Sequence, residues 1–120
     1  MAHQLLTQSE QARLDAAIRS AEQSCRAEIS IYLGAAEGSI RDFATSLHNT
    51  LVLPSRSILV LVDPDRRALE IVTGGRVRAT LTDEKAASIV REMTEAFGAG
   101  DLAGGLVGGV ERLGREARAV

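Results

Sequence analysis

Aromatic residues are scarce in this sequence: its 120 residues include no tryptophan, one tyrosine and two phenylalanines. Proteins that bind single-stranded nucleic acids stack bases on aromatic rings, and small-molecule pockets are commonly lined by such rings. The scarcity therefore argues against both kinds of site. It also predicts a core built mainly from leucine, isoleucine, valine and alanine.

Residues suited to redox and metal chemistry are equally few. Cys25 is the only cysteine, which excludes an internal disulfide and a thiolate metal cluster. His3 and His48 lie far apart without ligand spacing, so a zinc site is not expected. The formal net charge of −2 provides no electrostatic attraction to nucleic acids or anionic membranes, and we expect no nucleic-acid partner.

Long hydrophobic runs are absent as well. The longest, "ILVLV" at 58–62, is far shorter than the roughly 20 residues that span a bilayer. The N-terminal stretch "MAHQLLTQSEQ" lacks the basic and apolar regions of a signal peptide. We expect a soluble cytoplasmic chain without membrane insertion, folded as a single domain over 1–120, with 1–6 as a flexible N-terminal tail.

Helix caps and hydrophobic spacing predict four helices. Thr7 with Glu10, and Ser39 with Asp42, match the capping box that begins a helix. Further on, Thr82 or Asp83 and then Asp101 supply acceptor side chains in front of apolar positions at helical spacing. The predicted helices cover about 8–24, 39–51, 83–97 and 102–118.

Three segments are predicted strands. Residues 27–33 alternate apolar and polar side chains, whereas 57–62 are continuously aliphatic, as in a strand buried on both faces. "DPDRR" is a turn that leads into the alternating segment 68–73, its hairpin partner. A helical connection makes the first two strands parallel. We predict an α/β fold, a small three-layer α/β/α sandwich of order αβαββαα, whose mixed sheet has strand order 1-2-3 with 57–62 central.

The stretch "FGAGDLAGGLVGGVERL" at 97–113 is rich in glycine and invites comparison with a phosphate-binding loop. Such a loop follows a strand and opens a helix, but this stretch follows a predicted helix and contains no Gly-Lys-Ser/Thr. We interpret Gly98 as the left-handed residue that ends one helix and Asp101 as the cap of the next.

The remaining glycines of this stretch fall on two sides of the last helix. Gly105 and Gly109 border its apolar face, where they would allow close packing on the sheet or on the third helix. Gly104 and Gly108 lie on the far side and have no obvious internal partner. We interpret them either as glycines tolerated near a flexible helix start or as a close contact with another protein.

Acidic residues follow the two parallel strands, where ligands bind in open α/β sheets. Glu37, Asp63 and Asp65, with Arg66 and Arg67 nearby, form this rim. Carboxylates there could hold Ca²⁺ or Mg²⁺, although Asp-Pro-Asp is also ordinary turn chemistry.

Two further features have a functional and a structural interpretation. The run 73–75, Thr-Gly-Gly, is either an anion-binding nest of backbone amides or simply the turn that ends a strand. His48 is expected at the surface or in packing, because no serine–histidine–aspartate set can be proposed around it.

Four stretches together resemble the TPM domain, named for a thylakoid lumen protein, a photosystem II repair factor and a nematode receptor modulator. They are the N-terminal helix, "AEISIYLG", "SILVLVDPDRRALEIVTGG" and "LTDEKAASIVREMTEAFGAGDLAGGLVGGVERL", within a likeness over about 5–118. The nearest likeness is to a short actinobacterial branch. The aromatic residue usual after Gly-Asp in the family is Leu102 here.

The resemblance implies the same sandwich fold and a heterogeneous range of functions. Some plant members are credited with acid phosphatase activity and Ca²⁺ binding in an acidic cleft, whereas others assist assembly or turnover of membrane complexes. Carried onto this sequence, the metal-site candidates are Asp63, Asp65 and Asp101.

Two functional hypotheses follow from the sequence. The first is a non-enzymatic accessory domain that binds another protein through Gly104 and Gly108 on the last helix. The alternative is a metal-dependent, acid phosphatase-like hydrolase on the acidic rim, with Ca²⁺ or Mg²⁺ as its only cofactor.

Overall fold

The computed structural model describes residues 5–118 and contains four α-helices, one short 3₁₀ turn and three strands. In chain order these are α1 (Gln8–Cys25), β1 (Glu28–Leu33), α2 (Ile40–Asn49), η1 (Pro54–Arg56), β2 (Ser57–Asp63), β3 (Ala68–Thr73), α3 (Asp83–Gly98) and α4 (Leu102–Glu116). The predicted order αβαββαα is confirmed. Only the 3₁₀ turn was not expected.

The sheet has the predicted order β1-β2-β3, with β2 in the centre. Strand β1 pairs with β2 in parallel, and β2 pairs with β3 in antiparallel orientation. Every residue of β2 is buried, as its unbroken aliphatic run predicted. Asp63 pairs with Ala68 at the end of the hairpin, so residues 64–67 form the turn.

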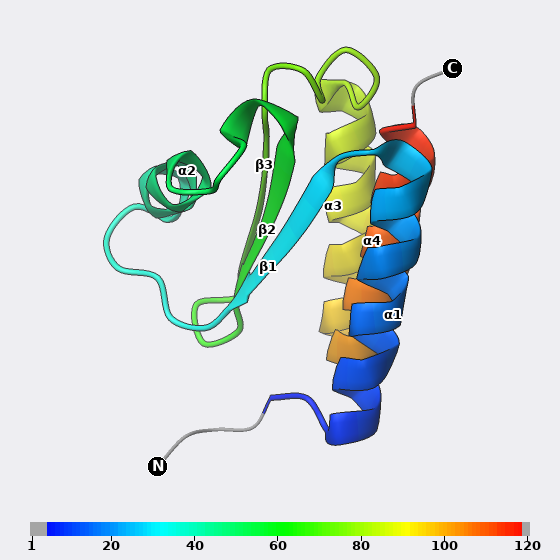
Figure 1. The fold of residues 1–120 in the computed structure, drawn as a ribbon. Helices are drawn as coiled ribbons and strands as arrows, with labels where there is room; N and C mark the ends of the chain where they lie inside the picture. The colour runs from blue at the N-terminus through cyan, green and yellow to red at the C-terminus, as the bar shows by residue number, and fades with distance from the viewer. Residues whose placement is uncertain (1–4, 119–120) are drawn as a thin grey trace.

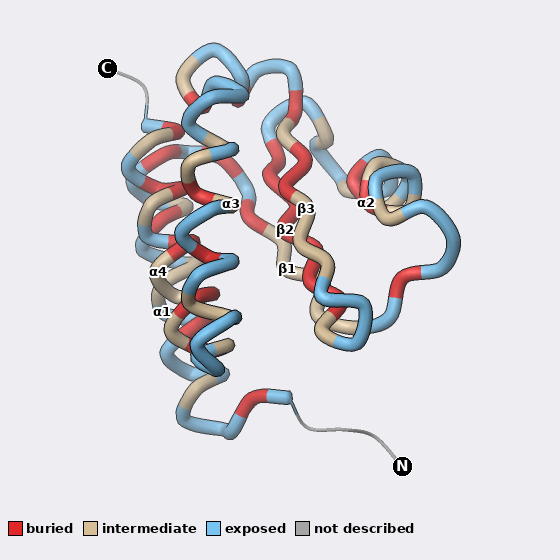
Figure 2. Tube along the Cα trace, turned by 180° about the vertical axis from the view of Figure 1, so that it is seen from behind, coloured by how far each residue is buried: buried red, intermediate tan, exposed pale blue. Residues whose placement is uncertain are grey.

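Helices cover both faces of the sheet, giving the predicted three layers (Figure 1). Helix α2 lies alone on one face, over a small cluster that contains Ala44, Leu59 and Leu61. The other face carries α1, α3 and α4, and α4 lies between α1 and α3, packing against both. The larger core fills this side, and the buried positions run along the inner surfaces of these three helices (Figure 2).

The alternation in β1 sends its side chains to different layers, as expected. Ile29, Ile31 and Leu33 belong to the core under α1, α3 and α4. Tyr32 faces α2, where its ring lies 5.5 Å from the ring of Phe43. Two of the three aromatic residues therefore help α2 to pack against the sheet.

The helix N-termini follow the predicted caps. Thr7 and Glu10 form a complete capping box, while Thr82 and Asp101 accept backbone N–H groups at the starts of α3 and α4. Ser39 accepts from the Asp42 N–H at the start of α2, but among the described residues the Asp42 carboxylate makes no return bond to the Ser39 N–H, so the second predicted capping box is only half formed.

The end of α3 differs from the prediction. Gly98 is the last helical residue, and the left-handed residue is Gly100, with φ of 85°. The Asp101 N–H donates to the Ala96 carbonyl at 2.9 Å and the Gly100 N–H to the Phe97 carbonyl at 3.0 Å. This is a Schellman motif, which places its left-handed residue one position beyond the C-cap. The assignment of that role to Gly98 was wrong by two residues.

The expected tail at 1–6 falls mainly on residues 1–4, which lie outside the described residues. Leu6 at its end is buried in the main core. Among residues 5–118, no helix has the length and apolar character that crossing a bilayer would require.

Candidate functional site

Asp63, the last residue of β2, is almost completely buried with 2% of its surface exposed. Its Oδ2 accepts the Ala36 N–H at 2.9 Å and its Oδ1 accepts the Arg66 N–H at 3.2 Å. The Ala36 bond is the main reason that the pKa of this carboxyl lies below its ordinary value, with help from the Arg66 N–H and guanidinium against the opposing effect of burial. Asp63 is thus an ionised carboxylate that holds backbone groups.

Arg66 completes the same arrangement from the turn. Its Nη1 donates to the Ala36 carbonyl at 2.9 Å, so Asp63 and Arg66 together bind both backbone groups of Ala36. We call these three residues the Ala36 clamp. It ties the β1–α2 loop to the β2–β3 turn, and it gives the Asp-x-x-Arg spacing of the turn a structural role.

The other acidic candidates lie in different settings. Asp65 is exposed in the turn, and Glu37 is exposed in the β1–α2 loop. Asp101 caps α4, where its Oδ1 accepts the Gly104 N–H at 2.9 Å. Within residues 5–118, no three or more His, Cys, Asp or Glu side chains are placed together so that they could hold a metal ion. Asp63, Asp65 and Asp101 therefore do not form a ready-made three-carboxylate site.

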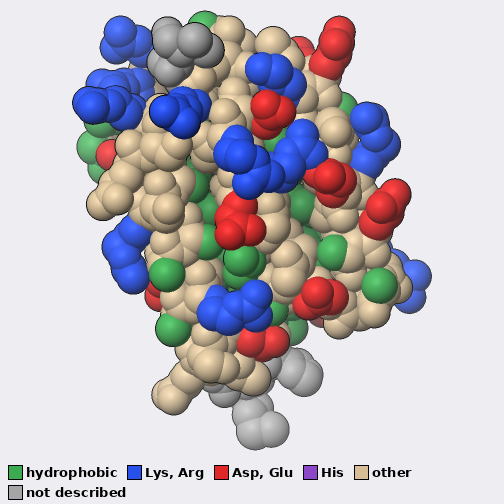
Figure 3. Space-filling view, turned by 90° about the vertical axis from the view of Figure 1, so that its right-hand side faces the viewer, with side chains coloured by type: hydrophobic (Ala, Val, Ile, Leu, Met, Phe, Trp, Pro, Cys, Tyr) green, Lys and Arg blue, Asp and Glu red, His purple; other side chains and the backbone are tan. Residues whose placement is uncertain are grey.

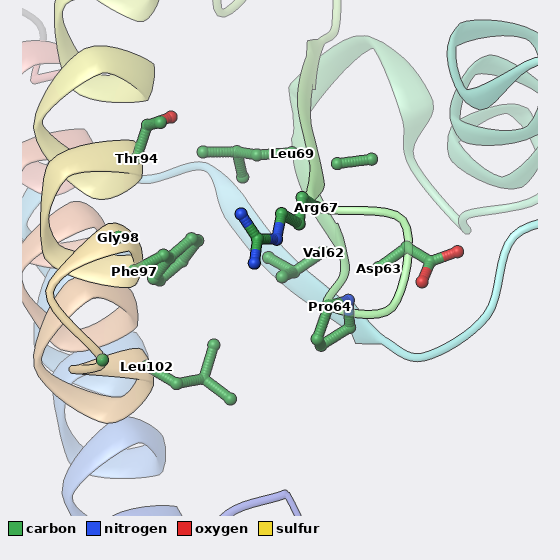
Figure 4. A pocket seen from close by; sticks show the side chains of 11 residues that line it. Val62, Asp63, Pro64, Arg67, Leu69, Thr94, Phe97, Gly98 and Leu102 are labelled. Atoms are coloured by element: carbon green, nitrogen blue, oxygen red, sulfur yellow. The ribbon is translucent and has the colours of Figure 1, made fainter.

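A pocket of about 450 Å³ lies between the β2–β3 turn and the junction of α3 with α4. Apolar side chains line most of it, namely Val62, Pro64, Ala68, Leu69, Phe97 and Leu102. The guanidinium of Arg67 points into the pocket towards Phe97, while the Asp63 carboxylate points away from it (Figure 4). Sequence reasoning grouped Arg67 with the acidic rim and missed this pocket.

The buried glycines of α4 are explained by close helix packing. A Cβ on Gly105 would lie 2.5 Å from Phe97 Cε1, and one on Gly109 would collide with the thioether of Met93. The prediction of close packing on the third helix is thus confirmed for this pair. Gly114, not singled out from the sequence, allows the same approach to α1, because its Cβ would lie 2.7 Å from Ala21 Cβ.

Gly104 and Gly108 have different surroundings. A Cβ on Gly104 would collide with the Asp101 carboxylate, so the capping side chain lies across this position. A Cβ on Gly108 would have no atom of residues 5–118 within 4 Å, apart from its own helix backbone and chain neighbours. Both glycines border a shallow groove between α3 and α4, whose edge carries the Arg112–Glu92 ion pair.

The helical side of the molecule carries scattered charges of both signs on a surface made largely of backbone and uncharged polar groups (Figure 3). Hydrophobic side chains appear there only in small, separate areas. An apolar interface of large area is therefore not present on this side.

Gly74, the first glycine after β3, has a structural role. A Cβ on Gly74 would collide with the backbone of Pro54 and Ser55, and its N–H donates to the Ser57 carbonyl at 2.9 Å. The Gly74 amide is thus occupied within the fold, as the strand-ending interpretation of 73–75 requires. His48 is buried in α2, with its Nε2 2.9 Å from the Ser57 carbonyl oxygen, in agreement with a packing role.

The sequence profile of the TPM domain matches residues 2–116. The chain belongs to the TPM domain family. Two curated relatives from Mycobacterium tuberculosis, the uncharacterized proteins MT2543 and Rv2468c, are each 28% identical over 100 residues. That match covers 83% of this chain but only 60% of each relative, so this TPM domain spans less than two thirds of their length.

Three solution structures share the fold of this TPM domain. The BA42 protein of Bizionia argentinensis superposes with a TM-score of 0.85 at 24% identity, over 98% of this chain and 84% of that one. An N-terminal domain from P. gingivalis superposes with a TM-score of 0.82 at 19% identity, over 92% of this chain and 75% of that one. The N-terminal domain of cg2496 from Corynebacterium glutamicum superposes with a TM-score of 0.75 at 17% identity, over 94% of this chain and 74% of that one.

Proposed function

We propose that this TPM domain is a non-enzymatic accessory module that binds a partner protein through the open side of α4 at Gly104 and Gly108. The observation that carries the proposal is the unused space at Gly108. A glycine inside a helix costs about 0.5–1 kcal/mol relative to alanine, and among residues 5–118 no neighbouring group would collide with a side chain at position 108.

The comparison within α4 supports this choice of position. Gly105, Gly109 and Gly114 are each required by a neighbouring helix, and Gly104 lies beneath the Asp101 cap. Gly108 alone among these five meets open space. A partner backbone in the groove between α3 and α4 would use that space as α3 uses the space at Gly109.

The experiment compares partner capture by the wild-type domain and by Gly108→Leu, with Ala16→Leu as the matched control. Ala16 is exposed on α1, so its leucine adds the same side chain outside the groove. We expect a protein that both wild type and Ala16→Leu retain and that Gly108→Leu loses. The purified pair should then reproduce this difference in a binding titration.

Equal retention of the same proteins by all three variants would contradict the interaction at Gly108. The unfolding midpoint of each variant serves as the folding control. Gly108→Leu has open space around the new side chain, so we expect it to remain folded.

The second candidate is a divalent-metal-dependent, acid phosphatase-like hydrolase on the acidic rim. The observation in its favour is an exposed carboxylate, Asp65, beside the ionised carboxylate of Asp63 at the carboxyl end of β2. On this hypothesis the Asp63/Asp65 rim would hold the ion, with Asp65 as the exposed ligand and solvent completing the shell.

A titration with Ca²⁺ or Mg²⁺, followed by amide chemical shifts, tests this candidate. A bound ion should perturb residues 34–38 and 63–66, and Asp65→Asn should remove the effect. Hydrolysis of an aryl phosphate at acid pH, abolished by the same substitution, would then assign the activity. Unperturbed amides across these two segments would eliminate the hydrolase.

A further inference from the structure

The pocket between the β2–β3 turn and the α3–α4 junction combines an apolar wall with a single cation. Its volume of about 450 Å³ lies within the range of sites that hold small molecules. Val62, Phe97 and Leu102 come from three different elements, β2, α3 and α4, so the pocket is formed only by the folded domain.

Arg67 is the charged group that enters this space (Figure 4). Across residues 5–118, no carboxylate lies within 4 Å of its guanidinium, and that group makes no hydrogen bond to the protein. Its backbone has φ of 52°, an unusual value for a residue with a side chain. This left-handed geometry ends the turn with the side chain directed towards α3.

Two nearby carboxylates are held in other contacts, and the exposed Asp65 of the same turn forms no ion pair with Arg67 in the described part of the chain. Asp63 contributes to the pocket wall, but both of its oxygens accept backbone N–H groups of the Ala36 clamp. Asp101, which lies between the lining residues Gly100 and Leu102, uses its Oδ1 to cap α4. Neither carboxylate is bonded to Arg67, so the five N–H donors of the Arg67 guanidinium are available to a ligand.

We propose that this pocket binds a small organic carboxylate with a compact apolar body. The planar guanidinium matches a carboxylate in bidentate geometry. One positive charge neutralises one negative charge, whereas a phosphate monoester dianion would leave an uncompensated charge against an apolar wall. The ligand's hydrocarbon part fills the space between Phe97, Leu69 and Leu102. This assignment is independent of the surface at Gly108.

The test titrates the isotope-labelled domain with hydrocinnamate and with octanoate, an aromatic and an aliphatic carboxylate. Hydrocinnamide supplies the same body without the charge, and phenyl phosphate supplies an aromatic body with a phosphate. We expect the two carboxylates to shift the amides of Val62, Leu69 and Gly98, and the neutral amide to leave them unchanged. Phenyl phosphate should bind more weakly than hydrocinnamate.

Two variants separate the charge from the cavity. Arg67→Gly suits the positive φ and removes the guanidinium, so we expect carboxylate affinity to fall about tenfold or more, the worth of a charged hydrogen-bond pair. Thr94→Trp places a large side chain from the exposed face of α3 at the pocket and should weaken binding with Arg67 intact. Arg76→Ala, which removes an exposed arginine beyond β3, is the matched charge control and should bind normally.

Several outcomes would overturn the proposal. These are unchanged pocket amides with both carboxylates, equal binding of hydrocinnamide, undiminished affinity in Arg67→Gly, or tighter binding of phenyl phosphate. Shifts confined to residues outside the pocket would also overturn it. Because all five are measured on protein whose amide spectrum shows that it is folded, a loss of structure cannot imitate any of them.

Discussion

Arg66 and Arg67 are neighbours in one four-residue turn, and their side chains serve different regions of the molecule. Arg66 turns towards the β1–α2 loop, where its guanidinium binds the Ala36 carbonyl. Arg67 turns towards α3 and points into an apolar pocket (Figure 4). Arg66 thus has a structural role and Arg67 a candidate binding role, although both are arginines in the same turn. The left-handed φ of Arg67, 52°, accompanies this difference.

The largest effect on stability should come from removing the Asp63 carboxylate, on which the Ala36 clamp depends. Asp63→Ala deletes the acceptor of the Ala36 and Arg66 N–H groups and leaves a buried donor without a partner, which is expensive. We expect a strong fall in the unfolding midpoint, measured by chemical denaturation. Asp65→Ala, an exposed neighbour in the same turn, should change the midpoint little, and equal losses in the two variants would refute the clamp.

The Asp63 carboxylate should also make the free energy of unfolding depend on pH in the acid range. Its folded-state pKa lies below the ordinary value of 3.8, so its contribution is fully present well above that pH. It is lost as the pH falls through 3.8 towards the lower folded-state pKa. Denaturation midpoints measured from neutral to acid pH should therefore decline less steeply in Asp63→Asn than in wild type. Parallel curves would show that Asp63 titrates normally.

Arg66→Ala should have a smaller effect than Asp63→Ala. It removes one hydrogen bond to the Ala36 carbonyl while the Asp63 contacts remain, a loss of about 1 kcal/mol in the free energy of unfolding. Amide exchange of Ala36 should quicken as its loop loosens. In a double variant with Asp63→Ala, the two losses should not add, since both act through the same backbone unit.

Arg67→Gly should shift stability in the opposite direction and by the smallest amount. Glycine adopts positive φ without the steric cost that a Cβ brings, while it adds entropy to the unfolded chain. We expect the free energy of unfolding to rise by about 0.5 kcal/mol, which is the difference between these two opposing effects. A loss of stability like that of Arg66→Ala would mean that Arg67 also holds the fold together.

Local chemistry made most of the fold predictable. The aliphatic run of β2, the alternation of β1 and β3, and the caps Thr7, Thr82 and Asp101 each depend on residues close in sequence. The left-handed residue after α3 was misplaced because a Schellman motif with Gly100 and a simple stop at Gly98 both use glycine. The φ of Gly100 and the hydrogen bonds from Asp101 to Ala96 and from Gly100 to Phe97 distinguish them, and these require the structure.

The candidate sites were less predictable because they depend on distant contacts. Asp63 could be recognised as an acidic residue after a buried strand, but its partner Ala36 lies 27 residues away. The direction of Arg67 required its backbone dihedral, and the pocket required the α3–α4 junction to approach the turn. In α4, by contrast, helical spacing correctly separated the packed pair Gly105 and Gly109 from Gly104 and Gly108.

The position of α4 between α1 and α3 has a consequence for the order in which the chain can fold. Helix α1 packs against α4, so Leu14 and Ala21 cannot reach their final neighbours until residues 102–116 have been synthesised. Closing so long a loop delays the contact and lengthens the time for which these apolar side chains are exposed to water. Ribosome-bound chains that end before α4 should therefore remain sensitive to proteolysis throughout α1, and become protected only once α4 has emerged.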